Sequence, residues 1–192
     1  DVSSSGHIGT LVFCTHPHIV TLGRKTQEGD VFAWDGPTLE VSRGGRATYH
    51  GPSQLVVYPI MNLDKQRPHR GPKDIGKFLR ALEDSIVEVL KHYGVQAVGK
   101  TMQIKDPTAD AAEETGVWVG SQKIASLGIA VKKWVTYHGA AINLEEDAKS
   151  FAGMRPCGFN SSIMVNLHTV LGNNVDRQEF KDLLKASLLE SL

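Results

Sequence analysis

The sequence is poor in cysteine, has no long apolar run and shows no excess of either charge. Two cysteines, Cys14 and Cys157, are too few for a disulfide framework and fit a reducing compartment. No stretch approaches the ~20 apolar residues that span a bilayer, and no positively charged, apolar leader opens the chain. We therefore expect a cytoplasmic protein with no membrane partner.

The charges balance, because the 21 lysines and arginines are matched by 21 aspartates and glutamates. Such a chain has no overall field that would attract nucleic acid, so no nucleic-acid partner is expected. Hydrophobic residues make up 41% of the 192 residues, which is typical of a globular protein. Without repeats or a long linker, a chain of this length predicts one domain over residues 1–192.

The eight residues GVQAVGKT, 94–101, match the letters of an ATP-binding phosphate loop. Such a loop follows a strand and opens a helix, so that backbone N–H groups converge on the phosphates. Here an amphipathic helical pattern over 73–93 comes before the first glycine, and the residues after Thr101 include Pro107 and have no helical period. This context argues against an ATP site. No metal is expected either, because the histidines and cysteines show no ligand spacing.

Hydrophobic alternation predicts more strands than helices, and consecutive strands are often close enough to form hairpins. A three-stranded meander is expected near the middle of the chain. A helix with Asp176 as its N-cap closes the chain, with Glu179 in the position of a capping box. We expect an α+β (mixed α/β) fold with a mixed, largely antiparallel sheet flanked by helices. The expected strands cover 7–14, 38–41, 54–63, 95–98, 116–120, 123–131 and 134–144, and the expected helices cover 73–93, 161–171 and 176–192.

The segment RGGRATYHGPSQ, residues 43–54, is the first candidate for a binding site. Its paired glycines, Gly44 and Gly45, would let a ligand lie against bare backbone. Several polar side chains lie within a few residues of them, among them Arg43 and His50. The alternative is a plain connecting loop with a surface histidine, and composition alone leaves the two interpretations even.

Cys157 lies between a proline and a glycine in RPCGFNSS. Most lone cysteines are small buried hydrophobic residues, and Cys14, within the apolar run TLVFC, fits that description. A Pro-Cys-Gly turn that opens a helix over 161–171 would instead expose the sulfur near a helix N-terminus, which favours the nucleophilic thiolate. Cys157 is therefore a candidate nucleophile, with packing as the alternative.

Lys123 stands at the head of the apolar run KIASLGIAV. Such a lysine is usually a surface residue that keeps its amine in water. A partly desolvated lysine, however, exchanges protons near neutrality and could hold a neighbouring thiolate by charge, then act as a base. His138, in TYHGAAIN, repeats the His-Gly pair of His50 and Gly51. Spacing alone leaves both histidines open between structural and chemical roles.

Taken in order, these segments resemble the lipoyl(octanoyl) transferase family. The family carries Arg-Gly-Gly-x-x-Thr-x-His-Gly-Pro, a Lys-Ile-x-x-x-Gly strand, a His-Gly-x-Ala-x-Asn strand and Pro-Cys-Gly, and all four are present here. The separation of 34 residues between Lys123 and Cys157 is also that of the family. Two features depart from it. Ser53 replaces the usual glycine of Gly-Pro-Gly-Gln, and the helical segment that usually precedes the first strand is not seen, so that part of the pocket wall is expected to be missing.

The resemblance implies an enzyme that moves an octanoyl (lipoyl) group from octanoyl-acyl carrier protein to a lysine of lipoate-dependent enzymes, the first step of protein lipoylation. The implied acceptors are the lipoyl domains of 2-oxoacid dehydrogenases and the glycine cleavage H protein. It also implies that Cys157 forms an acyl-thioester beside Lys123, and that the fold resembles biotin/lipoate protein ligase catalytic domains. The implied substrate-binding residues are Arg43, Gly44, Gly45, Arg46, Ala47, Thr48, Tyr49, His50, Ser126, Leu127, Gly128, Gly139, Ala140 and Ala141, with His138 as a further candidate.

Two other kinds of protein share parts of this pattern. An ATP-dependent lipoate-protein ligase would share the fold and the lysine, but it would not need Cys157, and its glycine-rich signature differs from RGGRATYH. A non-catalytic acyl or lipoyl-domain binding protein would be expected to lose Cys157 or Lys123, and both are present.

An acidic carrier protein calls for a basic docking surface. For any single lysine or arginine, however, a solvated charge is the commoner explanation. The candidates for such a surface are Lys65, Arg67, Arg70, Lys73, Lys132 and Lys133.

Overall fold

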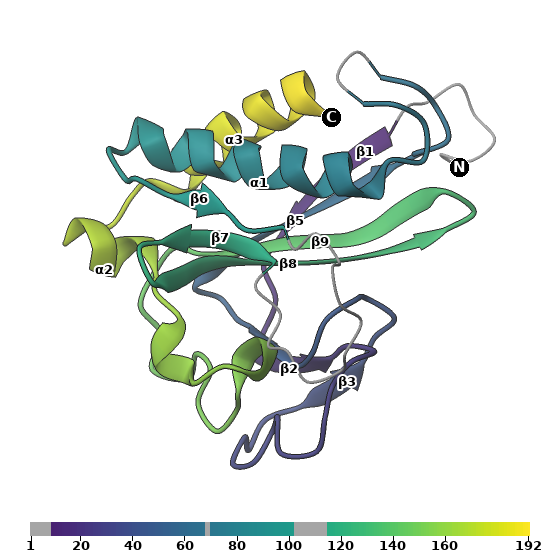
Figure 1. The fold of residues 1–192 in the computed structure, drawn as a ribbon. Helices are drawn as coiled ribbons and strands as arrows, with labels where there is room; N and C mark the ends of the chain where they lie inside the picture. The colour runs from purple at the N-terminus through teal and green to yellow at the C-terminus, as the bar shows by residue number, and fades with distance from the viewer. Residues whose placement is uncertain (1–8, 68–69, 102–114) are drawn as a thin grey trace.

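The computed structural model describes residues 9–67, 70–101 and 115–192. The beginning of the first expected strand and the segment around Pro107 lie outside these ranges. Among the described residues, a six-stranded sheet forms the centre of the fold, and every neighbouring pair of its strands is antiparallel (Figure 1). The order across this sheet is β1 (Gly9–Cys14), β5 (Gln54–Met61), β9 (Val135–Asn143), β8 (Gln122–Lys132), β7 (Gly116–Val119) and β6 (Val98–Gly99).

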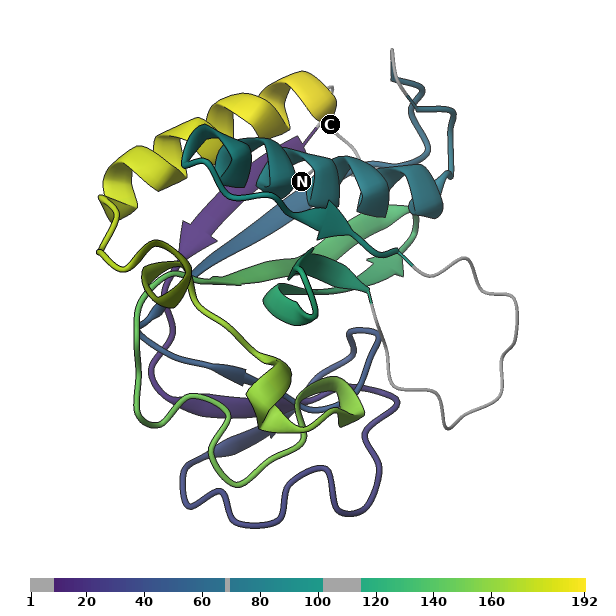
Figure 2. The same ribbon diagram turned by 60° about the vertical axis from the view of Figure 1, so that its left-hand side comes forward.

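Two helices, α1 (Ile75–His92) and α3 (Arg177–Ser191), lie side by side on one face of this sheet (Figures 1 and 2). Their apolar faces pack on alternate residues of the central strands, so that Leu82 of α1 and Leu184 of α3 share one core with Val57 of β5. Among the described residues, no helix is both long enough and apolar enough to cross a membrane.

A smaller, three-stranded sheet lies on the other side of the large sheet from the helices (Figure 1). Its central strand β2 (Ile19–Leu22) pairs in parallel with β3 (Thr38–Glu40) and antiparallel with β4 (Thr48–His50). The molecule therefore has three layers, and the expected mixed, largely antiparallel sheet with flanking helices is confirmed. The sequence did not predict β2, and it treated β4 as part of a loop, because runs of four and three residues are too short to show an alternating pattern.

The helix expected over 73–93 is present as α1, and Gly94 follows it with a φ of 76°. Glycine adopts this left-handed conformation readily, which is why it commonly follows a helix end. The first glycine of GVQAVGKT therefore ends a helix and does not follow a strand, as the sequence predicted. The expected N-cap of the last helix is also confirmed, since Asp176 accepts hydrogen bonds from the backbone N–H groups of Gln178 and Glu179.

The continuous helix expected over 161–171 is wrong. The structure has a short 3₁₀ turn at Ser161–Ile163 and a separate five-residue helix α2 (Leu167–Leu171). Asn160 and Asn166 each accept a hydrogen bond from a backbone N–H group two or three residues further on, which starts two separate turns. Cys157 consequently does not lie at the N-terminus of an α-helix, and helix-dipole stabilisation of its thiolate is excluded as an explanation.

Candidate active site

The side chains of Lys123 and Cys157 are in contact. Lys123 belongs to the large sheet, and Cys157 belongs to the chain segment that follows β9. The Lys123 side chain enters from the start of β8, is 1% exposed, and places its Nζ 3.6 Å from the Cys157 Sγ. The Val165 N–H donates to the Lys123 carbonyl over 3.0 Å, which joins the segment after Cys157 to β8. A surface role for Lys123 is therefore excluded, and two groups suited to acyl transfer lie in contact.

Cys157 occupies a strained backbone position. It lies in a 3₁₀ turn, Pro156–Gly158, with φ 54° and ψ 24°, a conformation that non-glycine residues adopt at a cost of the order of 1 kcal/mol or more. Its N–H donates to the Ala47 carbonyl over 3.0 Å, which ties the turn to the segment entering β4. Contacts elsewhere in the fold must therefore hold the cysteine in this conformation.

A cavity of about 410 Å³ opens beside Cys157. Its wall combines cavity-facing residues of β5, β8 and β9 with residues of the small sheet. Small residues face each other where β8 and β9 pair, as Ser126 does with Ala141 and Gly128 with Gly139. A cavity of this volume with small and apolar walls is suited to a small-molecule ligand or a short chain.

Most of the expected binding residues are brought together in this wall, and a minority are not. The cavity is lined by Arg43, Gly45, Thr48, His50, Ser126, Leu127, Gly128, His138, Gly139, Ala140, Ala141 and Cys157. Gly44, Arg46, Ala47 and Tyr49 lie outside this lining. Because side chains alternate along a strand, Thr48 and His50 face the cavity while Tyr49, between them, points to the other side of β4.

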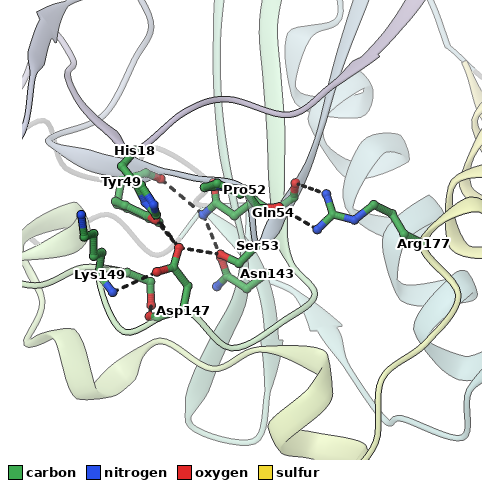
Figure 3. Close-up of polar contacts among 10 residues, drawn as sticks. His18, Tyr49, Pro52, Ser53, Gln54, Asn143, Asp147, Lys149 and Arg177 are labelled. Atoms are coloured by element: carbon green, nitrogen blue, oxygen red, sulfur yellow. Dashed lines mark hydrogen bonds and ion pairs between the residues drawn. The ribbon is translucent and has the colours of Figure 1, made fainter.

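Tyr49 belongs instead to a polar network behind the cavity wall (Figure 3). Its hydroxyl donates to the Asp147 carboxylate and lies 2.7 Å from the His18 Nδ1. Ser53 Oγ donates to the same carboxylate over 3.3 Å. Burial alone would raise the pKa of Asp147, but hydrogen bonds, that of Tyr49 foremost, bring this pKa below its usual value. The residue that departs from the family pattern, Ser53, therefore makes a hydrogen bond to a charged group.

Arg43 both lines the cavity and stabilises the neighbouring backbone. Its buried guanidinium donates to the carbonyl oxygens of Gly44, Arg46 and Thr21, over 2.8 to 3.0 Å, and fixes the glycine-rich turn. Burial, and next the charge of Arg43, lowers the pKa of His50 to about 3. Both expected histidines therefore line the cavity, and His50 does so in its uncharged form at neutral pH.

His138, His16 and Tyr58 of the wall are also uncharged near neutrality. Burial and the Arg43 charge lower the pKa of His138, and burial lowers that of His16. Burial raises the pKa of Tyr58 to about 12, and the Tyr58 hydroxyl lies 2.7 Å from the His16 Nε2. An apolar chain can therefore lie along His16, His50, Tyr58 and His138 without desolvating a charge on these side chains.

Sequence reasoning missed His16 and the residues of β5 that line the cavity. Val56, Tyr58 and Ile60 are two residues apart, so they share one face of the strand. That period was readable in QLVVYPIM, but a strand that is apolar on both faces does not show which face meets a ligand. His16 precedes β2, a strand the sequence did not predict.

The expected basic docking surface is partly wrong. Arg70 is 5% exposed and donates to the carbonyl oxygens of Leu63 and Gly71, so it is not available to a partner. Lys73 pairs with Asp64, although half of its side chain stays exposed. Lys132 and Lys133 are exposed at the turn between β8 and β9.

Comparison with known proteins identifies the family to which this chain belongs. Residues 2–189 match the family described as the lipoyl protein ligase A/B catalytic domain. The chain belongs to this family. An octanoyltransferase from Bdellovibrio bacteriovorus is 57% identical over 185 residues, covering 96% of this chain and 84% of the relative. An octanoyltransferase from Rickettsia peacockii is 36% identical over 188 residues, covering 94% and 83%. The resemblance to the octanoyltransferases, and with it an enzyme of that class, is confirmed.

Solved structures of the lipoyl protein ligase family and its neighbours share the fold. Ta0514 from T. acidophilum, solved with bound lipoic acid, has a TM-score of 0.76 at 20% identity, covering 99% of this chain and 76% of that one. A biotin protein ligase from Aquifex aeolicus has a TM-score of 0.56 at 15% identity, covering 90% and 69%. The expected biotin/lipoate ligase fold is therefore confirmed. At these identities the likeness concerns the fold alone.

Proposed function

We propose that this enzyme moves an octanoyl group from acyl carrier protein, through a thioester on Cys157, to the acceptor lysine of lipoyl domains. The observation that carries the proposal is the contact between Lys123 Nζ and Cys157 Sγ at the edge of an apolar cavity. The expected acceptors are the lipoyl domains of 2-oxoacid dehydrogenases and the glycine cleavage H protein.

In the first step, the Cys157 thiolate attacks the carbonyl carbon of the carrier thioester. A new carbon–sulfur bond forms, the old one breaks, and the carrier leaves as a thiolate that takes up the proton of the charged Lys123, which leaves Lys123 neutral. One thioester replaces another, so the step needs no ATP. Lys123, in its charged form, stabilises the Cys157 thiolate before the attack.

In the second step, the acceptor amine attacks the Cys157 thioester, the amide forms, and Cys157 leaves as a thiolate. A lysine in solution has a pKa near ~10.4, so the acceptor arrives as an ammonium and must lose two protons, one before it attacks and one as the amide forms. The first proton goes to solvent, and we assign the second to Lys123 in its neutral form, which lies against the sulfur and returns to the charged state as the thiolate is released.

The cavity would hold the alkyl tail. At ~0.8 kcal/mol for each buried methylene, an octanoyl chain would gain several kcal/mol from the walls of β5, β8 and β9. Because β8 advances about 3.4 Å per residue, the stretch of β8 from Lys123 to Gly128 is roughly 17 Å long, and both Cys157 and Gly128 line the cavity. An extended chain attached to Cys157 would follow this wall.

The decisive experiment is intact-protein mass spectrometry after mixing with octanoyl-acyl carrier protein in the absence of ATP. We expect wild type and Cys14→Ser to gain one hydroxylamine-labile octanoyl group, and Cys157→Ser to gain none. Cys14→Ser is the matched control because Cys14 is the other cysteine of the chain. Absence of an adduct on folded wild type would contradict the proposal, and adduct formation or ligation that requires ATP would favour a lipoate-protein ligase.

A further inference from the structure

We infer that a buried ion pair between Asp30 and Arg46 is a positioning device for the Cys157 turn. This inference rests on the proposed function, because it concerns how the nucleophile of that reaction is held. Neither residue lines the cavity, so the pair acts through the backbone that carries the cysteine.

The pair is buried and geometrically fixed. The Asp30 side chain is 1% exposed and that of Arg46 11% exposed. Both carboxylate oxygens of Asp30 accept hydrogen bonds from the Arg46 guanidinium, with Nε 3.0 Å from Oδ2. Oδ2 also accepts from the Gln27 N–H over 2.9 Å. Such a two-pronged pair fixes the plane of the guanidinium as well as its position.

The guanidinium lies directly against the turn that holds the nucleophile. Gly158 has a φ of 83°, and a Cβ atom added to it would lie 2.5 Å from the Arg46 Nη1. The backbone of Gly158 therefore packs on the guanidinium where any other residue would collide with it. Arg46 occupies the space under the residue that follows Cys157.

Backbone hydrogen bonds from Asp30 and from the neighbour of Arg46 also hold this turn. The Asp30 carbonyl accepts from the Arg155 N–H over 2.7 Å, and the carbonyl of Ala47, next to Arg46, accepts from the Cys157 N–H over 3.0 Å. The ion pair thus connects the segment of Asp30 with the segment of Arg46 and Ala47, and each of these segments is hydrogen-bonded to the cysteine turn. Because φ of Cys157 is unfavourable by itself, the turn keeps its conformation only while these contacts persist.

This role differs from the one that the resemblance implied for Arg46. The family pattern Arg-Gly-Gly-x-x-Thr leaves its position open, and the structure places its charge on Asp30 and not in the cavity. A group that contacts the substrate changes the concentration of donor at half-saturation. A group that positions the nucleophile changes the rate of loading at saturating donor.

The test compares Asp30→Asn, Arg46→Gln and their double variant, with loading of octanoyl from its carrier as the reaction. We expect each single variant to lower the loading rate constant at least 10-fold, with the half-saturating donor concentration within 2-fold of wild type. The loading rate constant of the double variant should be no lower than that of the slower single variant, because the two changes remove the same interaction. Ile86→Val is the control, since it removes a methylene from the core under α1, away from the turn, and should load at the wild-type rate.

A second readout covers variants that load too slowly to measure. In a Cys14→Ser background, alkylation of Cys157 by iodoacetamide should slow at least 5-fold at pH 7 when the pair is broken. If Asp30→Asn does not fold, Arg46→Lys replaces it in the test. This variant keeps the charge but loses the two-pronged contact, so its loading and alkylation rates should fall in the same direction by a smaller factor.

The outcomes separate the two hypotheses. Wild type that takes up no octanoyl group contradicts the proposed function, and alkylation then tests the ion pair on its own. Wild type that loads, with folded single variants within 2-fold of its rate, overturns the positioning role. A raised half-saturating concentration at an unchanged rate would also overturn it, because Arg46 would then contact the donor.

Discussion

The Nζ of Lys123 lies 3.6 Å from the Sγ of Cys157, although 34 residues separate them in the chain. Lys123 is fixed at the start of β8, and the Cys157 turn is tied to the segment before β4 and, through Val165, to β8 itself. The Lys123 Nζ also lies 5.7 Å from the centre of the Trp118 ring on β7. The dyad is thus held by the central sheet on one side and by the small sheet on the other.

The two proposed roles of Lys123 predict different losses for two variants. Lys123→Met removes both the charge and the base, and should lower loading of Cys157 at least 100-fold. Lys123→Arg keeps a charge that cannot be given up, so it should slow loading, and a preloaded enzyme should not deliver its octanoyl group. Single-turnover transfer from preloaded enzyme to a lipoyl domain measures delivery alone. Normal delivery by Lys123→Arg would remove Lys123 as the base.

His50 predicts how the stability of the enzyme depends on pH. Its pKa is lowered to about 3 in the folded chain, against an ordinary value of 6.5, so the unfolded chain takes up the proton first. The contribution of neutral His50 is complete above pH 6.5 and is lost as the pH falls towards 3, by up to about 1.4 kcal/mol per unit. In urea unfolding between pH 7 and 4, wild type should lose stability more steeply than His50→Gln. Parallel curves for the two proteins would contradict this assignment.

Ser53 predicts a stability effect without a catalytic one. Its hydroxyl donates to Asp147 behind the cavity wall, and it is absent from the lining. Ser53→Gly, which restores the usual residue of the family, should lower the free energy of unfolding by about 1 to 2 kcal/mol, through the lost hydrogen bond and the freer glycine backbone. Ser53→Ala separates these terms, because it removes the hydroxyl alone. Octanoyl loading by both variants should stay within 2-fold of wild type, and a larger loss would place Ser53 in the active site.

The sequence predicted the parts of this structure that have a local pattern. The meander β7–β8–β9, α1 and the N-cap of α3 follow from periodicity and capping, and the dyad residues were singled out by short motifs. The separate turns after Cys157 could not be predicted in the same way, because the apolar spacing of SSIMVNLHTVL suits a helix. Only the pairing of Met164 and Val165 with the distant Lys123 shows that the chain is extended there.

The same limit applies to the binding residues. Motif resemblance marked 43–50 as one continuous stretch, whereas a strand exposes alternate residues to the cavity, so Thr48 and His50 line it and Tyr49 does not. The contact between Arg46 and Asp30 joins residues on two loops whose approach depends on the small sheet. No period in the sequence encodes that approach, and the positioning role of the pair became visible only in three dimensions.

Gly128 predicts the chain-length preference of the cavity. It lies on β8, five residues beyond Lys123, and a Cβ atom added there would lie 3.1 Å from the Arg43 Cδ and 3.2 Å from the Gly44 carbonyl oxygen. Gly128→Ala should therefore narrow the cavity at a point that a long acyl chain reaches and a short one does not. We expect the ratio of octanoyl to butanoyl loading rates to fall about 10-fold, the size of effect that one methylene has in an apolar pocket. Gly71→Ala is the matched control and should leave the ratio unchanged, because among the described residues no atom beyond its chain neighbours lies within 4 Å of the added Cβ. Equal slowing of both acyl groups by Gly128→Ala would mean that the chain does not follow β8.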